Sequence, residues 1–164
     1  MPPIAVPEKL KPFWQAFSSQ WNGDADARFY EAFYFCDNEQ DAEELGQLVL
    51  AGTKRATASL LMAHEAEGKP LPEVGALSIV TNWSGEPLCV IETTRVDIVP
   101  FDQVTAEFAA TEGEGDKSLA YWREGHWRFF SRECQQLGLE PSSDMLVVCE
   151  RFQVVYPHVD RTAC

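Results

Sequence analysis

Residues 50–60, LAGTKRATASL, mark the point at which a helix is expected to end and a strand to begin. Residues 38–51 carry helical signals, because Asn38 can cap the first turn and apolar side chains recur on one face. Gly52 stands where a C-terminal glycine ends a helix. The following chain alternates, with hydroxyl residues on one face and apolar residues on the other: Thr57 and Ser59, against Ala56, Ala58 and Leu60. We expect the hydroxyl face to point toward a site or solvent and the apolar face toward the core.

The length and composition of the chain indicate a single domain. It has 164 residues, of which 45% are hydrophobic, enough to bury one core. Residues 1–7 carry three prolines and are expected to form a flexible arm, and residues 8–164 one domain with an N-terminal helical extension. The sequence has no apolar run long enough for a membrane span and no secretory leader, which predicts a cytoplasmic location.

The charge balance restricts the class of ligand. The net charge is -13, with 26 acidic and 13 basic residues, so the field of the molecule repels polyanions and anionic membranes. We therefore expect neither DNA nor a membrane as a partner. The ligand is expected to be a small nucleoside, or an RNA held through a local patch.

Cysteine and histidine spacing predicts neither a metal nor another cofactor. The five cysteines are widely spaced and include no C-x-x-C pair, which argues against a disulfide framework and a zinc site: Cys36, Cys89, Cys134, Cys149 and Cys164. Most are expected to be small buried side chains. His64, His126 and His158 lack partners at metal-ligand spacing.

The rest of the pattern predicts an α+β domain with a small curved or closed sheet. Helices are expected over residues 8–21, 38–51, 101–110 and 116–137, the last capped by Asp116. Strands are expected over residues 55–60, 76–81, 87–99 and 145–156, with 76–81 and 87–99 as an antiparallel hairpin. Residues 65–75 are expected to form a loop. A cluster of aromatic side chains is assigned to the core: Phe29, Phe33, Tyr34 and Phe35.

Lys54 and Thr57 form the first candidate site. A lysine that is partly removed from water has a lowered pKa, and its neutral amine can accept the proton of a nearby hydroxyl nucleophile. The spacing has an equally ordinary structural explanation. A lysine is favoured at a helix C-terminus, and threonine is common in strands.

Residues 111–116, TEGEGD, form the second candidate site. Glu112, Glu114 and Asp116 lie in one glycine-rich segment, where they could raise one another's pKa values or hold a hard cation such as magnesium. They could equally gather at the N-terminus of the following helix, where the dipole favours anions. Glu112 fits that explanation least, because it precedes the expected cap.

An aromatic and basic group forms the third candidate: Tyr121, Trp122, Arg123, His126, Trp127 and Arg128. Stacking on aromatic rings beside arginine is one way in which proteins recognise bases. Most of these residues fall on the apolar stripe of the expected helix and suit the core, so Tyr121 and Arg123 are the better ligand candidates. Trp83, in a turn between strands, is either a recognition residue or part of a lid.

Three segments together resemble the ASCH domain family, in particular its longer bacterial branch. They are GTKRATAS (52–59), PEVGALSIV (72–80), and a PF-x-x-V motif followed by EFAATEGEGDKSLAYWR (107–123). The resemblance implies a PUA-like β-barrel, mixed or antiparallel, with flanking helices and a cleft beside the G-x-K-x-x-T segment. It also implies a link to RNA binding and RNA modification.

Some small bacterial members of the family are amidohydrolases that remove an acyl group from the exocyclic amine of acylated cytidine. The resemblance implies that Lys54, Thr57 and Glu112 are the catalytic residues of a metal-independent reaction of this kind. Thr57 would attack the carbonyl, Lys54 would take its proton, and Glu112 would orient the lysine or protonate the departing amine. Glu114 is the alternative acid. The expected substrate-binding residues are Arg55, Ser59, Glu114, Tyr121 and Arg123.

The alternative hypothesis is an RNA-binding module or a ribonuclease that uses the same cleft. It requires a local basic patch, formed by Lys54, Arg55, Arg95 and Arg123. A sensor that binds a small ligand without turnover is a third hypothesis.

Overall fold

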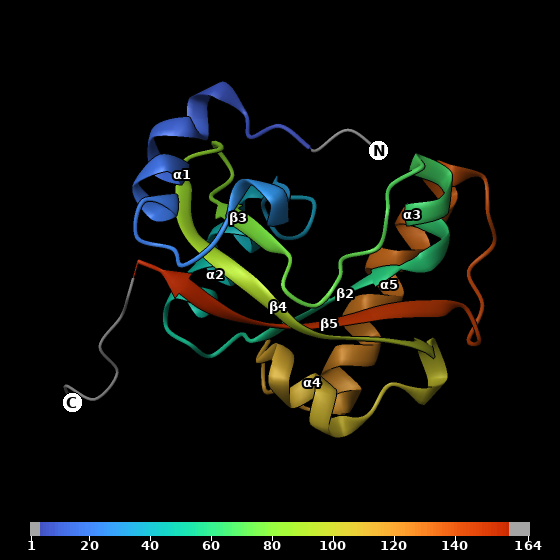
Figure 1. Cartoon of the computed structure of the whole chain (residues 1–164). Coiled ribbons are helices and arrows are strands. Elements are labelled where there is room, and N and C mark those ends of the chain that lie inside the picture. Colours follow the sequence, from blue (N-terminus) through green and yellow to red (C-terminus); the bar gives the residue numbers. More distant parts are fainter. Residues whose placement is uncertain (1–3, 158–164) are drawn as a thin grey trace.

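The computed structural model describes residues 4–157, which form a curved sheet with helices around it (Figure 1). The strands within this range are β1 (Phe29–Phe33), β2 (Ala56–Leu60), β3 (Leu77–Thr81), β4 (Pro87–Pro100) and β5 (Leu146–Tyr156). The α-helices are α1 (Lys11–Ser18), α2 (Glu39–Leu50), α3 (Leu61–Glu67), α4 (Ala106–Glu112) and α5 (Leu119–Leu137). Three short 3-10 segments complete the order: η1 (Glu8–Leu10), η2 (Asp26–Arg28) and η3 (Phe101–Gln103).

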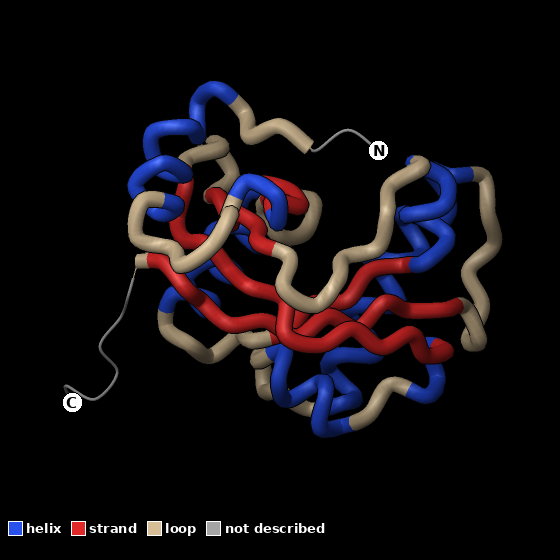
Figure 2. Tube along the Cα trace, viewed as in Figure 1, coloured by secondary structure: helices blue, strands red, loops and turns tan. Residues whose placement is uncertain are grey.

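The strands form one mixed sheet in the order β1-β3-β4-β5-β2, which confirms the α+β class and the expected hairpin of β3 and β4. The β1–β3 pair is parallel, and the other three pairs are antiparallel. Figures 1 and 2 show β4 and β5 crossing the whole molecule, and irregular register at Thr93/Arg95 interrupts their pairing. Such an irregularity bends a strand and curves the sheet.

The sheet is curved, one of the two expected forms, but it does not close into the barrel that the family resemblance implied. Within the described residues β1 and β2 are the two edges, and no hydrogen bonds join them. Each edge strand has only five residues and is already paired on one side, β1 with β3 and β2 with β5. The strand β1 itself was missed, because its aromatic residues were interpreted as a core cluster without regular structure.

Helix ends follow their local capping chemistry. The Asn38 side chain accepts a hydrogen bond from the Asp41 amide and caps α2, as expected. The expected cap of α5 was wrong, since Ser118 accepts from the Tyr121 amide and Asp116 instead accepts from the Ser118 amide. The N-terminal helix ends at Ser18 rather than residue 21.

The expected loop over residues 65–75 is partly helical. The helix α3 follows β2 directly and ends at Gly68, whose φ of 64° is left-handed. Its apolar residues pack on the largest hydrophobic cluster, so burial outweighs the loop-forming residues nearby.

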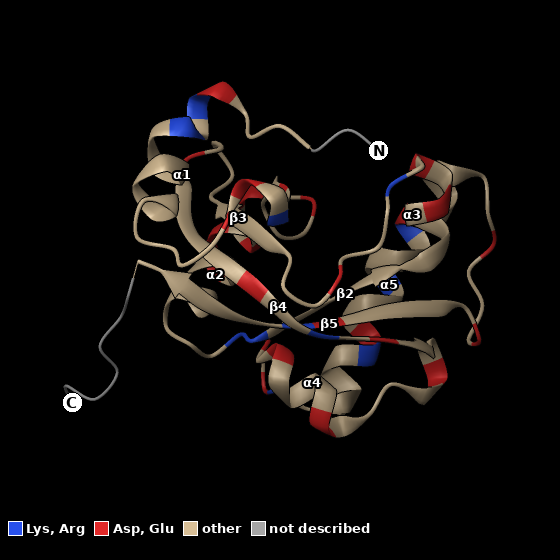
Figure 3. Cartoon of the chain, viewed as in Figure 1, with Lys and Arg blue, Asp and Glu red and all other residues tan. Residues whose placement is uncertain are grey.

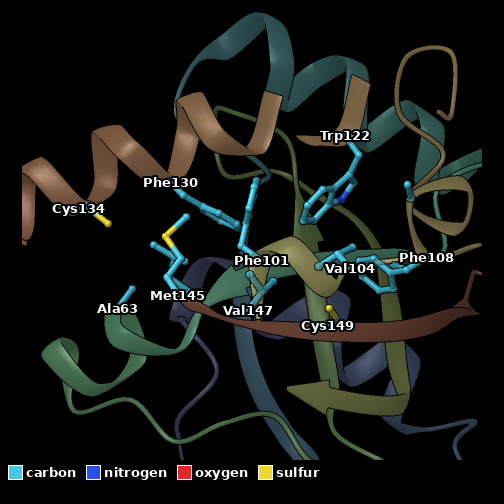
Figure 4. Packing of buried hydrophobic residues seen from close by; sticks show 13 residues of the cluster. Ala63, Phe101, Val104, Phe108, Trp122, Phe130, Cys134, Met145, Val147 and Cys149 are labelled. Atoms are coloured by element: carbon cyan, nitrogen blue, oxygen red, sulfur yellow. The ribbon is translucent and has the colours of Figure 1, made fainter. Parts of the chain in front are cut away.

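The largest cluster lies between the sheet and the helices α3, α4 and α5, and Figure 4 shows Trp122, Phe101 and Phe108 packed within it. Two smaller clusters form around α1 and α2. Two aromatic residues assigned to the core are exposed instead: Tyr34 is 42% exposed and Trp127 38% exposed. Three of the cysteines are buried, as expected: Cys89, Cys134 and Cys149.

Residues 1–3 of the expected arm of residues 1–7 lie outside the described residues, and so do His158 and Cys164. Within the described part, Val6 packs against the cluster around α1. Of the helices described here, none has the length and hydrophobicity needed to span a bilayer.

Candidate functional site

A cavity of about 1100 Å³ lies where the sheet is open, and both edge strands contribute to its wall. The wall carries eight acidic residues: Glu31, Asp37, Asp41, Glu44, Glu112, Glu114, Glu133 and Glu150. Five basic residues also line it: Lys54, Lys69, Lys117, Arg128 and Arg132. A cavity of this size accepts a small organic molecule. The acidic excess disfavours a polyanion and suits a neutral ligand.

The turn after α2 places Lys54 in the cavity wall. Gly52 has a φ of 81°, and the amides of Thr53 and Lys54 both donate to the Leu48 carbonyl, at 2.9 and 3.0 Å. This left-handed turn satisfies free carbonyls at the helix end and directs the lysine inward. The Lys54 side chain is only 1% exposed.

Gly113 ends α4 directly after Glu112, the residue that pairs with Lys54. Gly113 has a φ of 70°, and a Cβ at this position would overlap the Thr53 carbonyl oxygen. The Arg55 amide also donates to the Thr111 carbonyl at 2.9 Å. The end of α4 and the turn before β2 are therefore held together through their backbones. Glu112 is the last residue of α4, whereas the sequence predicted that this helix ends at residue 110.

These contacts bring Lys54, Glu112, Glu114 and His126 together in one buried charge cluster. Lys54 Nζ donates to Glu112 Oε1 at 3.0 Å and to the Ala56 carbonyl at 2.8 Å, and lies 3.6 Å from Glu114 Oε1. Glu112 Oε2 lies 3.1 Å from His126 Nε2 and accepts a hydrogen bond from the Trp122 indole. Both Glu112 oxygens therefore have partners, although this side chain is only 1% exposed.

The charges in this cluster stabilise one another. Burial favours neutral Lys54, but the Glu112 and Glu114 carboxylates outweigh it and hold the Lys54 pKa above its ordinary value. Burial likewise favours neutral Glu112, but Lys54 and His126 lower its pKa to about 2. Burial lowers the His126 pKa, but the charge and hydrogen bond of Glu112 together with the Glu114 charge outweigh it and hold this pKa above its ordinary value. The sequence-based role of Lys54 as a base assumed a lowered pKa, and the shift has the opposite direction.

Three side chains of the cluster could act as metal ligands. Donor atoms of Glu112, Glu114 and His126 lie within 4.8 Å of one another. Carboxylate and imidazole groups suit several divalent cations. However, the Lys54 ammonium lies against the same carboxylates and supplies the positive charge. A metal-free site stays our prediction.

The hydroxyl face of β2 also faces the cavity. Thr57 and Ser59 both line it, and Ser59 Oγ lies 2.9 Å from His64 Nε2. In the sheet Thr57 is directly opposite Glu150 of β5. Within the described residues Thr57 forms no side-chain hydrogen bond with Lys54 or Glu112, so the three proposed catalytic residues share a cavity wall without being linked into one network.

The other predicted residues divide into two groups. Glu114 and Tyr121 line the cavity, and Tyr121 is 49% exposed. Arg55, Arg95 and Arg123 are exposed and do not belong to the cavity wall. Because these three arginines lie outside the wall, the proposed basic patch does not form around the cavity. Arg95 instead pairs with Asp97, and Arg123 donates to the Asp102 carbonyl.

Trp83 is neither a free tip nor a lid over the site. Its ring centroid lies 4.7 Å from that of Tyr34, and its amide donates to Glu43 of α2. Tyr34 lines the cavity and Trp83 does not. The turn between β3 and β4 thus supports a tyrosine at the cavity rim.

Sequence reasoning placed His126 in the aromatic and basic group but did not link it to Lys54 and Glu112, and it did not consider Glu150. His126 follows Trp122 by four residues, which places both on one helix face, and their rings stack with centroids 4.1 Å apart. That spacing could have suggested a joint contact to the preceding carboxylates. The position of Glu150 depends on strand register, for which the sequence has no local signal.

The chain has a PUA-like α+β fold with an open mixed sheet, and the Lys54–Glu112 pair lies in the cavity wall. The family model described as ASCH domain matches residues 31–156. The chain belongs to the ASCH domain family.

Solved structures agree with this assignment. An ASCH domain from Lactobacillus crispatus JV V101 is 44% identical, with a TM-score of 0.86, and the match covers 93% of this chain and 97% of that one. A protein from Enterococcus faecalis V583 is 32% identical, with a TM-score of 0.79 and coverage of 94% and 98%. No sequence among the curated proteins compared matches this chain.

Proposed function

We propose that this ASCH domain is a metal-independent amidohydrolase that removes the acyl group from acylated cytidine or a related nucleoside. The observation that carries the proposal is the arrangement of Lys54, Thr57 and Glu112 around one cavity. The acidic excess of the wall adds support, because a nucleoside carries no phosphate to be repelled. Tyr34 and Tyr121 offer ring faces for a pyrimidine.

Thr57 is proposed as the nucleophile. Its oxygen attacks the acyl carbonyl carbon, the bond to the exocyclic nitrogen breaks, and water then hydrolyses the threonine ester. The substrate-binding set reduces to Ser59, Glu114 and Tyr121 from the sequence-based residues, because Arg55 and Arg123 lie outside the cavity wall.

Lys54 acts in this proposal as a cation. Two of its three N–H groups are used by Ala56 and Glu112, and Glu114 at 3.6 Å is beyond normal hydrogen-bond distance. The third N–H can therefore be donated to a ligand oxygen. A positive charge at this position stabilises the oxyanion that forms during attack. Glu112 holds the ammonium in place as a carboxylate.

The test is incubation with acetylcytidine while cytidine release is followed by chromatography. Wild-type protein is expected to release cytidine, and Thr57→Ala to be slower by about 100-fold or more. Thr94→Ala is the matched control, because Thr94 is exposed on β4 and outside the cavity wall. No release by wild-type protein, or full activity of Thr57→Ala, would show the proposal to be wrong.

The second candidate function is RNA binding or RNA cleavage in the same cavity. It is favoured by the PUA-like fold and by Lys117 and Arg128, which are exposed basic residues of the cavity wall. Phosphate contacts of this kind weaken steeply with salt. If single-stranded RNA binds at low salt and Lys117→Ala or Arg128→Ala weakens it, this function is supported. If no RNA binds at low salt, this second function is ruled out.

A further inference from the structure

The cross-strand partner of Thr57 is Glu150, a half-buried carboxylate. In the antiparallel β2–β5 pair Thr57 is directly opposite Glu150, between the pairs Ala56–Arg151 and Ala58–Cys149. Directly opposed side chains lie on the same face of a sheet, with Cβ atoms about 4.5–5.5 Å apart. Ala58 and Cys149 pack in the largest hydrophobic cluster, so Thr57 and Glu150 project from the opposite face. Both residues line the cavity.

One oxygen of Glu150 is held and the other is free. Thr93 of β4 donates to Glu150 Oε1 at 2.7 Å, which fixes the carboxylate from the side opposite to β2. Within the described residues Oε2 accepts no hydrogen bond from a side chain or a backbone amide. A carboxylate supported in this way can accept the proton of a hydroxyl on the neighbouring strand.

The protonation states of the cavity agree with this role. Burial raises the pKa of Glu150 to about 6, with Glu31 of β1 adding to the effect and Thr93 and Lys69 opposing it. Glu150 is therefore mostly a carboxylate at neutral pH, with a basicity close to that of a histidine. Lys54, by contrast, is held as a cation and is a poor acceptor.

We propose that Glu150 is the general base of the reaction, taking the proton from Thr57 as its oxygen attacks the acyl carbon. The new bond joins Thr57 Oγ1 to the acyl carbon, and the carbon–nitrogen bond of the substrate breaks. The proton held by Glu150 passes to the departing exocyclic nitrogen. In the second step Glu150 takes a proton from water as it attacks the ester, and threonine leaves with that proton.

This inference rests on the proposed function, but its test does not depend on a cytidine substrate. Nitrophenyl acetate acylates activated hydroxyls, and the acetyl group can be located by acid quench and peptide mass mapping. We expect wild-type protein to be acetylated on Thr57, at a rate that rises between about pH 5 and 7. In Glu150→Gln, acetylation is expected to be about 100-fold slower or more and to lose this pH step.

The substitution keeps the shape of the side chain, and glutamine can still accept from Thr93. Glu92→Gln is the matched control, because Glu92 lies on β4 outside the cavity wall and bonds to Gln153. It should behave as wild type. Circular dichroism of each variant confirms that it is folded.

Equal rates of Thr57 acetylation in wild type and Glu150→Gln would overturn the proposal. So would the absence of label on Thr57 in wild type, or label on Ser59 instead, whose partner is His64. A third outcome would separate the two proposals. If acetylation of Thr57 depends on Glu150 but acetylcytidine releases no cytidine, the amidohydrolase function is refuted and the role of Glu150 as general base is supported.

Discussion

At the scale of single residues, the site depends on charges that are buried together. Lys54 and Glu112 are each about 1% exposed and lie 3.0 Å apart. Two charges removed from water are tolerated only when they pair closely and their remaining hydrogen-bonding groups are satisfied. Ala56, Trp122 and His126 supply those remaining partners. Each member of the cluster is therefore needed by the others.

Replacing Lys54 tests this dependence. Lys54→Met leaves the Glu112 carboxylate buried without its cation, and we expect the free energy of unfolding at pH 7 to fall by about 3–5 kcal/mol. Urea unfolding followed by circular dichroism measures it. Lys54→Met combined with Glu112→Gln should recover much of the loss, because no unpaired carboxylate remains. A cost below about 1 kcal/mol for the single variant would contradict the buried pair.

Glu150 has the opposite effect on stability. Its folded pKa of about 6 exceeds its ordinary value of 4.5, so the folded state binds more protons between these values and its stability falls as pH rises through them. The difference corresponds to at most about 2 kcal/mol. Glu150→Gln should therefore gain stability relative to wild type by up to about 2 kcal/mol between pH 4 and pH 8.

Urea unfolding of wild type, Glu150→Gln and the control Glu92→Gln at both pH values checks this expectation. A difference between Glu150→Gln and wild type that stays constant with pH would show that the carboxyl titrates normally. A residue that lowers stability at neutral pH and faces a cavity is the pattern expected of a functional group.

At the scale of secondary-structure elements, the site depends on the contact between the end of α4 and the turn before β2. The contact is made by backbone atoms, since the Arg55 amide donates to Thr111 and Gly113 lies against Thr53. Gly113 meets two requirements, a positive φ and the absence of a Cβ. Through this contact Glu112 reaches Lys54.

Gly113→Ala and Gly138→Ala together separate these two requirements. Gly138 ends α5 with nearly the same φ, 71° against 70°, but a Cβ there would meet open space. Gly138→Ala should cost about 1 kcal/mol for the left-handed conformation. Gly113→Ala should cost at least about 2 kcal/mol more, because the backbone must move.

Chemical unfolding of both variants gives the two costs, and cytidine release gives the effect on the site. Only Gly113→Ala should lose activity, because Glu112 shifts with the backbone. Equal costs for the two variants would mean that the Thr53 contact adds nothing to stability.

At the scale of the whole molecule, charge and sheet topology together define the ligand. Figure 3 shows acidic residues distributed over helices, strands and loops, in keeping with the net charge of -13. The cavity shares this character, with eight acidic and five basic residues in its wall. Its position depends on the topology, because the two edge strands β1 and β2 both contribute to its wall.

Salt dependence distinguishes the two candidate ligands at this scale. A nucleoside has no phosphate, so kcat/KM for acetylcytidine should change by less than about twofold between 50 and 200 mM salt. An RNA held through four phosphates would lose affinity by about 50-fold over the same range. Steady-state kinetics and RNA titrations at both salt concentrations decide the matter. A steep loss in kcat/KM would contradict a neutral ligand.

The sequence by itself determined those features that depend on neighbouring residues. The cap at Asn38, the helix end at Gly52 and the alternation of Thr57 and Ser59 follow from local chemistry, and the structure has all three. The α+β class and the β3–β4 hairpin were predicted on the same basis. The proximity of Lys54 and Glu112 came from the family resemblance, because 58 residues separate them in the chain.

Only the tertiary structure decided how distant segments meet. Strand register placed Glu150 opposite Thr57, and the packing of α5 brought His126 to Glu112. The direction of the Lys54 pKa shift is set by a balance between burial and two carboxylates, which only the folded structure brings together. Residues 50–60 supply the lysine and the threonine through local geometry. Their electrostatic environment is supplied by the rest of the fold, because charge interactions depend on distance in space rather than along the chain.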